Sequence, residues 1–215
     1  MKRKYHGLHV IVDDDTRWPR DPVTQAEAAC LGGARVLQLR AKRAPDRQTL
    51  HWARRIRRVT QEAGVLFVLN DRFDIALLAE ADAVHLGQED VSPVQIPSEI
   101  RDALDIGRST HDLEQAERAL DEGARYIGYG PVFGTQSKDT PYAARGIDGL
   151  AEIAAAVRPL PVIAIGGIGA TAASCIHSAG AAGLAVISSV AAAPDPVGVT
   201  RELAKAFASG DEASA

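Results

Sequence analysis

The stretch PVIAIGGIG, residues 161–169, joins a five-residue apolar run to a pair of glycines. A short continuous apolar run rich in β-branched residues is typical of a strand buried on both faces, as in a parallel sheet. The same kind of run recurs along the chain, with helix-like segments between the runs. The other runs are residues 8–12, 36–39, 65–69, 83–86, 104–107, 126–129 and 184–187.

Eight strands that alternate with helices in 215 residues predict a single (β/α)₈ barrel, a TIM barrel of the α/β class. A doubly wound sheet is the weaker alternative because it usually has about five or six strands. Residues 46–63 illustrate the helices, since Leu50, Ala53, Ile56 and Val59 form one apolar stripe. We expect one barrel domain over residues 1–208 and a disordered tail over residues 209–215.

Composition and charge exclude several classes of protein. Hydrophobic residues make up 46% of the chain and charged residues 24%, which is ordinary for a globular protein and argues against a disordered, collagen-like or membrane protein. The net charge of −4 does not favour nucleic acid as a partner. Cys30 and Cys175 lack the spacing of a disulfide framework or a zinc site. No apolar stretch reaches the ~20 residues of a membrane span, so we expect a cytoplasmic protein with small-molecule substrates. Its oligomeric state does not follow from the sequence.

Polar residues follow several of the predicted strands. The loops after parallel strands gather at one rim of a barrel, so residues distant in sequence converge there. Gln38, Arg40 and Lys42 are spaced by two, and in an extended backbone their side chains point the same way, into the barrel mouth. Other polar residues of the rim are Asn70, Asp71, Gln88, Glu89, Asp90, Ser109, Lys138, Ser188 and Ser189.

Two carboxylates and three cations stand out on this rim. Asp71 and Asp90 are oxygen ligands of the kind that Mg²⁺ prefers, and Arg40, Lys42 and Lys138 are able to neutralise phosphate charge. Each aspartate alone is more simply a helix cap. Together with the cations, the pair predicts a site for Mg²⁺ and a polyphosphate.

A second anion site is predicted after the last two strands. Gly166 and Gly167 follow the seventh strand, and Ser188 and Ser189 follow the eighth, where such barrels commonly bind phosphate through backbone amides. The long connection 130–145 has the length of a lid that closes over substrates. Residues 13–15, three consecutive aspartates, are interpreted as a solvated turn, and His85 as a core residue.

The motifs resemble those of the thiamine-phosphate synthase family, also called thiamine-phosphate pyrophosphorylase. The resemblance extends from the first strand to Pro196, and the order and number of the motifs make it specific. The matching stretches are QLRAK (38–42), NDR (70–72), VHLGQED (84–90), STH (109–111), GYGPVF (128–133), TQSK (135–138), AIGGI (164–168) and AVIS (185–188).

The resemblance implies a barrel enzyme that joins 4-amino-2-methyl-5-hydroxymethylpyrimidine diphosphate to 4-methyl-5-(2-phosphoethyl)thiazole and releases diphosphate. It implies Mg²⁺ held by Asp71 and Asp90. The implied pyrimidine diphosphate ligands are Gln38, Arg40, Lys42, Asn70, Ser109 and Lys138. The implied thiazole phosphate ligands are Thr135, Gln136, Ser137, Gly167, Ile187 and Ser188. Arg40, Lys42, Lys138 and Ser109 are the expected catalytic residues.

The expected mechanism is dissociative: diphosphate leaves, the aminopyrimidine carries the cation, and Mg²⁺ and the three cations stabilise the charge on the leaving group. Three positions depart from the family pattern. Ala41 replaces a common acidic residue and Ser137 a common threonine. Arg108 stands where a small apolar residue usually precedes the serine, and it either perturbs the site at Ser109 or points into the barrel wall.

Two other functions are the alternatives. One is a thiazole tautomerase, an isomerase of the same fold, whose subfamily typically has histidine where this chain has Pro131. The other is a non-catalytic barrel that senses phosphorylated metabolites. Two metal carboxylates and three cations would be unexplained in such a sensor, so the synthase is the favoured function.

Overall fold

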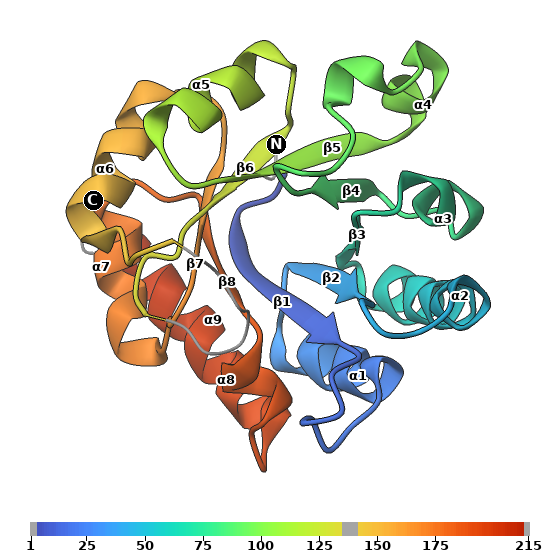
Figure 1. Cartoon of the computed structure of the whole chain (residues 1–215). Coiled ribbons are helices and arrows are strands. Elements are labelled where there is room, and N and C mark those ends of the chain that lie inside the picture. Colours follow the sequence, from blue (N-terminus) through green and yellow to red (C-terminus); the bar gives the residue numbers. More distant parts are fainter. Residues whose placement is uncertain (1–3, 135–141, 213–215) are drawn as a thin grey trace.

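Within residues 4–134 and 142–212, which the computed structural model describes, eight parallel strands close into one barrel (Figure 1). Each strand pairs with its neighbours in sequence, and β1 pairs with β8 to close the ring. The fold prediction is confirmed. The strands are β1 (Gly7–Asp13), β2 (Val36–Arg40), β3 (Leu66–Asn70), β4 (Ala83–Leu86), β5 (Asp105–Thr110), β6 (Tyr126–Tyr129), β7 (Val162–Ile165) and β8 (Gly183–Val186).

Helices form the outer ring around the strands, as Figure 1 shows. In the described part of the chain, none of them combines the length and apolarity needed to cross a membrane. The α-helices are α1 (Pro22–Gly32), α2 (Asp46–Ala63), α3 (Phe73–Leu78), α4 (Ser98–Ala103), α5 (Leu113–Asp121), α6 (Gly146–Ala156), α7 (Ala173–Ser178), α8 (Ser188–Ala191) and α9 (Pro196–Glu212). Short 3₁₀ helices are η1 (Pro93–Gln95) and η2 (Ala170–Ala172).

Alternation along the strands creates two separate cores. On β1, Leu8, Val10 and Val12 pack in the large core between strands and helices, whereas Ile11 belongs to a smaller core inside the barrel. Tyr5 and Tyr126 stack in the inner core with ring centroids 4.5 Å apart. The Tyr5 hydroxyl donates to Asp105 at the start of β5, at 2.7 Å. These contacts fill the amino-terminal half of the barrel and leave space at the carboxyl-terminal half.

Strand β5 extends further than its apolar run predicts. It covers residues 105–110 rather than 104–107. Arg108, Ser109 and Thr110 are therefore part of the barrel wall, because parallel pairing with β4 and β6 satisfies their backbone even though their side chains are polar. This extension sets Ser109 beside Gly128 of β6, in register.

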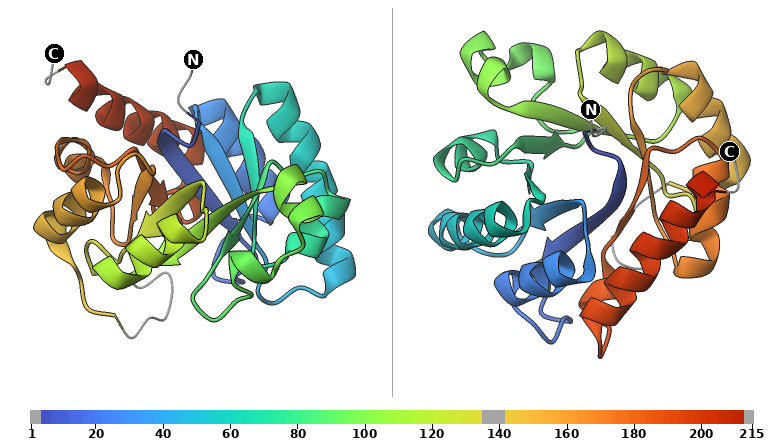
Figure 2. Two further views of the ribbon diagram at one scale, coloured as in Figure 1. Left: turned by 90° about the horizontal axis from the view of Figure 1, so that it is seen from above. Right: turned by 180° about the vertical axis from the view of Figure 1, so that it is seen from behind.

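The last helix crosses the expected boundary between the barrel domain and the tail. Helix α9 continues to Glu212, well past residue 208. Its Leu203 and Phe207 are buried, and the Phe207 ring meets the His177 ring edge-on at 5.1 Å, so packing anchors the part of the helix that belongs to the expected domain. The disorder of residues 209–215 remains a prediction. The right panel of Figure 2 shows α9 along the outside of the barrel, and it packs against α1 and α7.

A substitution at Gly107 would test the packing of the inner core. A Cβ at this position on β5 would collide with the Tyr126 ring, whose hydroxyl oxygen would lie 2.7 Å away. We expect Gly107→Ala to lower the free energy of unfolding by ~1–3 kcal/mol through overpacking. Urea unfolding measures the effect. Gly134→Ala is the matched control, since among the described residues no atom beyond its chain neighbours lies within 4 Å of a Cβ there. Equal losses in both variants would contradict this account of the core.

Candidate active site

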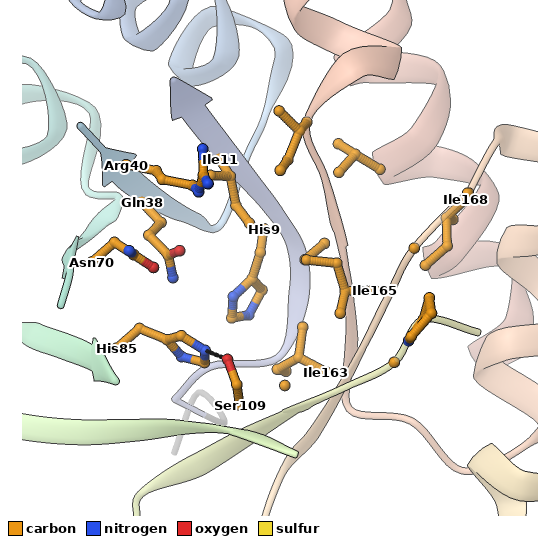
Figure 3. Close-up of a pocket in the computed structure, with 18 of the residues that line it drawn as sticks. His9, Ile11, Gln38, Arg40, Asn70, His85, Ser109, Ile163, Ile165 and Ile168 are labelled. Carbon is orange, nitrogen blue, oxygen red and sulfur yellow. Dashed lines mark hydrogen bonds between the residues drawn. The ribbon is translucent and has the colours of Figure 1, made fainter. Parts of the chain in front are cut away.

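A cavity opens at the carboxyl-terminal ends of the strands, and its two sides differ in chemistry (Figure 3). Strands β1 to β5 supply the polar side, and β7, β8 and the loops after them supply the apolar and glycine-rich side. The polar side consists of His9, Gln38, Arg40, Asn70, His85 and Ser109. The opposite side consists of Ile163, Ile165, Gly166, Gly167, Ile168, Ala185, Val186, Ile187 and Ser188.

Arg40 is held in place by a buried carboxylate. Its Nη1 donates to Asp13 Oδ2 at 2.5 Å, and the Asp13 side chain is 3% exposed. Gln25 of α1 fixes the Asp13 backbone by accepting from its N–H and donating to its carbonyl. The interpretation of Asp13 as part of a solvated turn is therefore wrong. Asp13 is the last residue of β1 and is in register with Arg40 of β2. Its ion pair with Arg40 compensates the burial of its carboxylate.

Asp14 organises the loop that carries Lys42. Its carboxylate accepts the backbone N–H groups of Lys42, Arg43 and Ala44, at 3.0, 2.8 and 2.7 Å. The Lys42 ammonium lies 2.5 Å from Asp71 Oδ2. The first and second strand ends thus set the position of a cation over the end of the third.

Asp71 and Asp90 come together on the rim beside the cavity. Asp71 has a left-handed backbone, with φ of 65°, and its N–H donates to the His85 carbonyl at 2.8 Å. Burial raises the pKa of Asp90, and the adjacent Asp71 carboxylate raises it further, against the Gly87 N–H that donates to Asp90 at 2.6 Å. Two carboxylates facing one ammonium leave a net negative charge, which suits a bound cation.

His85 does more than fill the core. It is buried, as predicted, but its ring lines the cavity and is hydrogen-bonded at both nitrogens. Nε2 pairs with Ser109 Oγ at 2.9 Å, and Nδ1 pairs with the Tyr126 hydroxyl at 3.1 Å. The Tyr126 hydroxyl also bonds Gln38, and burial raises the pKa of Tyr126. A hydrogen-bonded chain therefore connects Gln38 to Ser109 through the cavity wall.

His9 and Tyr126 are cavity residues that the sequence reasoning missed. Both lie on strands with side chains directed inward, below the polar rim. The signal that could have revealed His9 and His85 is the two-residue periodicity of strands, which places alternate side chains on the inner face of the barrel. Asn70 stands beside His85 in register, so placing Asn70 in the site also places His85 there.

The glycine pair has a packing role. A Cβ on Gly166 would meet Pro131 at 2.6 Å, and one on Gly167 would collide with the Gly134 carbonyl. Gly166 and Gly167 also have positive φ, at 104° and 63°. These glycines let the loop after β6 lie against the loop after β7, where Phe133 N–H donates to the Gly166 carbonyl at 3.0 Å.

The predicted thiazole phosphate ligands are described in part. Gly167, Ile187 and Ser188 all line the cavity, on the side opposite Arg40 and Asn70. Four predicted site residues lie outside the described residues, and their roles remain predictions: Thr135, Gln136, Ser137 and Lys138. Much of the predicted lid lies outside them as well.

Arg108 points into the barrel wall, which settles the choice between the two expectations. Its Nη1 donates to the Gly87 carbonyl at 2.7 Å, and its Nε lies 3.8 Å from Glu122 Oε2. The residue is 4% exposed and is not among the residues that line the cavity. It therefore contacts the loop that carries Asp90 rather than Ser109 itself.

A (β/α)₈ barrel with charged groups over one half of its mouth and glycine loops over the other has the layout of phosphate-binding barrel enzymes. The thiamine monophosphate synthase family model matches residues 8–190. The chain belongs to this family, so the resemblance seen in the motifs is confirmed.

Individual relatives agree with the family match. The chain is 45% identical to the thiamine-phosphate synthase of Anaeromyxobacter dehalogenans over 95% of its length and 89% of that protein. It is 42% identical to the thiamine-phosphate synthase of a Roseiflexus species, over 94% of this chain and 85% of that one. The solved thiamine phosphate pyrophosphorylase from Pyrococcus furiosus superposes with a TM-score of 0.85 at 38% identity, over 95% of this chain and 96% of that one.

His9 makes stability depend on pH. Burial lowers the pKa of His9 from 6.5 to about 4, and its Nε2 donates to the Tyr5 carbonyl at 2.9 Å. Between pH 6.5 and pH 4 the imidazole of His9 is protonated in the unfolded chain but neutral in the folded chain. The free energy of unfolding is therefore at its full value above pH 6.5 and falls as the pH decreases toward 4. The whole effect amounts to about 3 kcal/mol.

We expect His9→Gln to flatten the pH dependence of the free energy of unfolding within this window. Denaturant unfolding at a series of pH values measures the slope. His51→Gln on the exposed face of α2 is the control and keeps the slope of the wild type. A slope in His9→Gln equal to that of the wild type would show that another group causes the dependence.

Proposed function

We propose that this chain is a thiamine-phosphate synthase that transfers the pyrimidinylmethyl group of 4-amino-2-methyl-5-hydroxymethylpyrimidine diphosphate to the nitrogen of 4-methyl-5-(2-phosphoethyl)thiazole. The observation that carries the proposal is one cavity with two unlike halves. Arg40 lines one half, with Lys42 and the two aspartates beside it at the strand ends, and glycine loops build the other half. Relatives of this length and identity named as synthases support it.

The pyrimidine diphosphate is assigned to the polar half. Gln38 and Asn70 offer amide donors and acceptors inside the cavity, and Ser109 offers a hydroxyl fixed by His85. Arg40 stands above them toward the rim (Figure 3), with its guanidinium held by Asp13. This order from depth to rim suits a ring at the bottom and a charged diphosphate at the mouth.

Mg²⁺ fits the paired carboxylates, and Asp71 and Asp90 would hold it. The support is their contact, which raises the pKa of Asp90 and which a divalent cation would relieve. Among the described residues, no three His, Cys, Asp or Glu side chains form a metal cluster. The remaining ligands would be phosphate and water oxygens, as is usual for Mg²⁺. When bound, the ion supplies charge neutralisation and Lewis acidity to the diphosphate.

Arg40 and Lys42 act on the leaving group. The bond between the pyrimidine methylene and the diphosphate oxygen breaks, and its electron pair leaves with the oxygen. The two cations stabilise the charge that gathers there, and their anchoring by Asp13 and Asp14 makes this stabilisation preorganised. Lys138 is the proposed third cation.

The thiazole phosphate is assigned to the opposite half. Its nitrogen captures the pyrimidine cation and forms the new carbon–nitrogen bond, so no protein nucleophile is needed. Ser188, Ile187 and Gly167 are the proposed contacts of the phosphate end. Ile163 and Ile165 belong to this half, and their apolar surface keeps out water that would otherwise capture the cation.

The direct test incubates purified protein with both substrates and Mg²⁺ and identifies the product by mass spectrometry. The expected result is thiamine phosphate together with diphosphate. Isomerisation of a carboxylated thiazole phosphate without synthase turnover would instead support the tautomerase. Binding of either substrate without any turnover would support the phosphometabolite sensor.

The paired carboxylates give a sharper prediction. Asp71→Asn and Asp90→Asn are expected to lower kcat by on the order of 10²-fold or more, because each removes charge that stabilises the transition state through the metal. The measurement is the synthase rate over a Mg²⁺ titration, with circular dichroism to check folding. Asp74→Asn, at an exposed carboxylate on α3, is the control. A folded variant with wild-type rates would show that the substituted aspartate does not hold the metal.

Ser188 separates the two substrate halves. We expect Ser188→Ala to raise KM for the thiazole phosphate by about 10-fold, the effect of one lost phosphate hydrogen bond of ~1.5 kcal/mol, and to leave KM for the pyrimidine diphosphate unchanged. Saturation curves for both substrates measure this, and Ser178→Ala on the outer helix α7 is the control. A rise confined to the pyrimidine diphosphate would reverse the assignment of the halves.

A further inference from the structure

The loop between β4 and η1, residues 87–92, is fastened at several points. This loop carries Asp90 and is called the Asp90 loop below. Gly87 is its first residue: its N–H donates to Asp90 Oδ2 at 2.6 Å, and its carbonyl accepts from the Asp90 N–H. Gly87 therefore sets both the backbone and the carboxylate of Asp90.

Arg108 holds the Gly87 carbonyl from the neighbouring strand. The 2.7 Å bond from its Nη1 crosses from β5 to the end of β4, where Leu86 and Arg108 are in register. The Arg108 side chain is 5% exposed, so it contacts little water. A buried guanidinium keeps its charge and makes strong, directional hydrogen bonds.

Glu122 connects Arg108 to the far end of the Asp90 loop. One carboxylate oxygen of Glu122 lies 3.8 Å from Arg108 Nε, and the other accepts from Ser92 Oγ at 2.8 Å. The Glu122 side chain is 15% exposed. The two members of one ion pair thus contact the two ends of the loop, Arg108 at residue 87 and Glu122 at residue 92.

The energetics of this pair suggest a role other than stability. Burying two charges costs desolvation energy that their attraction often fails to recover, and an apolar pair of similar size is frequently as stable. Burial lowers the pKa of Arg108, and the nearby Glu122 and Asp90 charges oppose that shift. What the ion pair supplies that an apolar pair does not is a fixed geometry for the Gly87 carbonyl and the Ser92 hydroxyl.

We propose that Arg108 and Glu122 are positioning residues that fix the Asp90 loop and thereby set the affinity of the Asp71–Asp90 pair for its cation. This inference rests on the proposed function of that pair. Neither residue touches the cavity. Partners that orient a metal ligand from outside typically change metal affinity by about 10- to 100-fold when they are removed.

The test compares Arg108→Met with the control Arg125→Met. Arg125 makes an ion pair with Asp105, at 3.4 Å, at the other end of the barrel, so the same substitution leaves the Asp90 loop intact. In Arg108→Met we expect the Mg²⁺ concentration for half-maximal synthase rate to rise about 10- to 100-fold. KM for the thiazole phosphate and kcat at saturating Mg²⁺ stay near their wild-type values.

A second readout is independent of turnover. Hydrogen exchange of the ligand-free proteins should show faster exchange of the amides of residues 87–92 in Arg108→Met and wild-type exchange in Arg125→Met. If the wild type makes no thiamine phosphate, the proposed function fails, and the exchange data still decide whether the ion pair holds the loop. Unchanged exchange in Arg108→Met, or faster exchange without a shift in Mg²⁺ dependence, overturns the proposal.

Glu122→Gln keeps the test decisive if Arg108→Met does not fold. Glutamine retains the volume and a hydrogen bond to Ser92 but loses the charge that faces Arg108. We expect a shift in Mg²⁺ dependence in the same direction. Where Arg108→Met folds, the double variant shows a combined effect smaller than the product of the single effects. An Mg²⁺ dependence of Glu122→Gln identical to the wild type contradicts the shared role of the pair.

Discussion

Closure of eight parallel strands is the constraint on which the rest of the molecule depends. Because all strands run the same way, their carboxyl ends meet at one rim, and because side chains alternate, half of them must point into the barrel. The inner core of Tyr5, Tyr126 and small aliphatic residues fills the amino-terminal half. The remaining interior is the cavity, so the position of the site is a consequence of how the barrel is filled.

Charge is distributed unevenly around that cavity. The cations of the polar half are paired with carboxylates, Arg40 with Asp13 and Lys42 with Asp71. An exposed ion pair contributes little to stability. A cation paired with a buried carboxylate, as Arg40 is with Asp13, is nevertheless held in a fixed place. The apolar half presents isoleucines and glycine backbone instead. The proposed reaction, in which diphosphate leaves one substrate and the other substrate captures the resulting cation, suits this division.

Residues that never touch the cavity determine much of its geometry. Gln25 fixes Asp13, Asp14 fixes the backbone around Lys42, and Arg108 with Glu122 fixes the loop of Asp90. These groups are buried or half-buried, and Gln25, Asp14 and Arg108 are hydrogen-bonded to backbone atoms, so each transmits its own position to a functional side chain. Arg108, which departs from the family pattern, also acts from outside the cavity, because its side chain lies between strand β5 and the Asp90 loop.

The sequence by itself determined the barrel, because strand periodicity and the alternation with helices are local properties that each segment expresses independently. It also determined that Gln38, Arg40, Asn70 and Ser109 share one rim, since strand ends converge in any such barrel. Tertiary structure decided the burial of Asp13, the chain of Gln38, Tyr126, His85 and Ser109, and the direction of Arg108. Each of these depends on a partner more than ten residues away, and the pairing of distant side chains is fixed by register and packing, which no local pattern encodes.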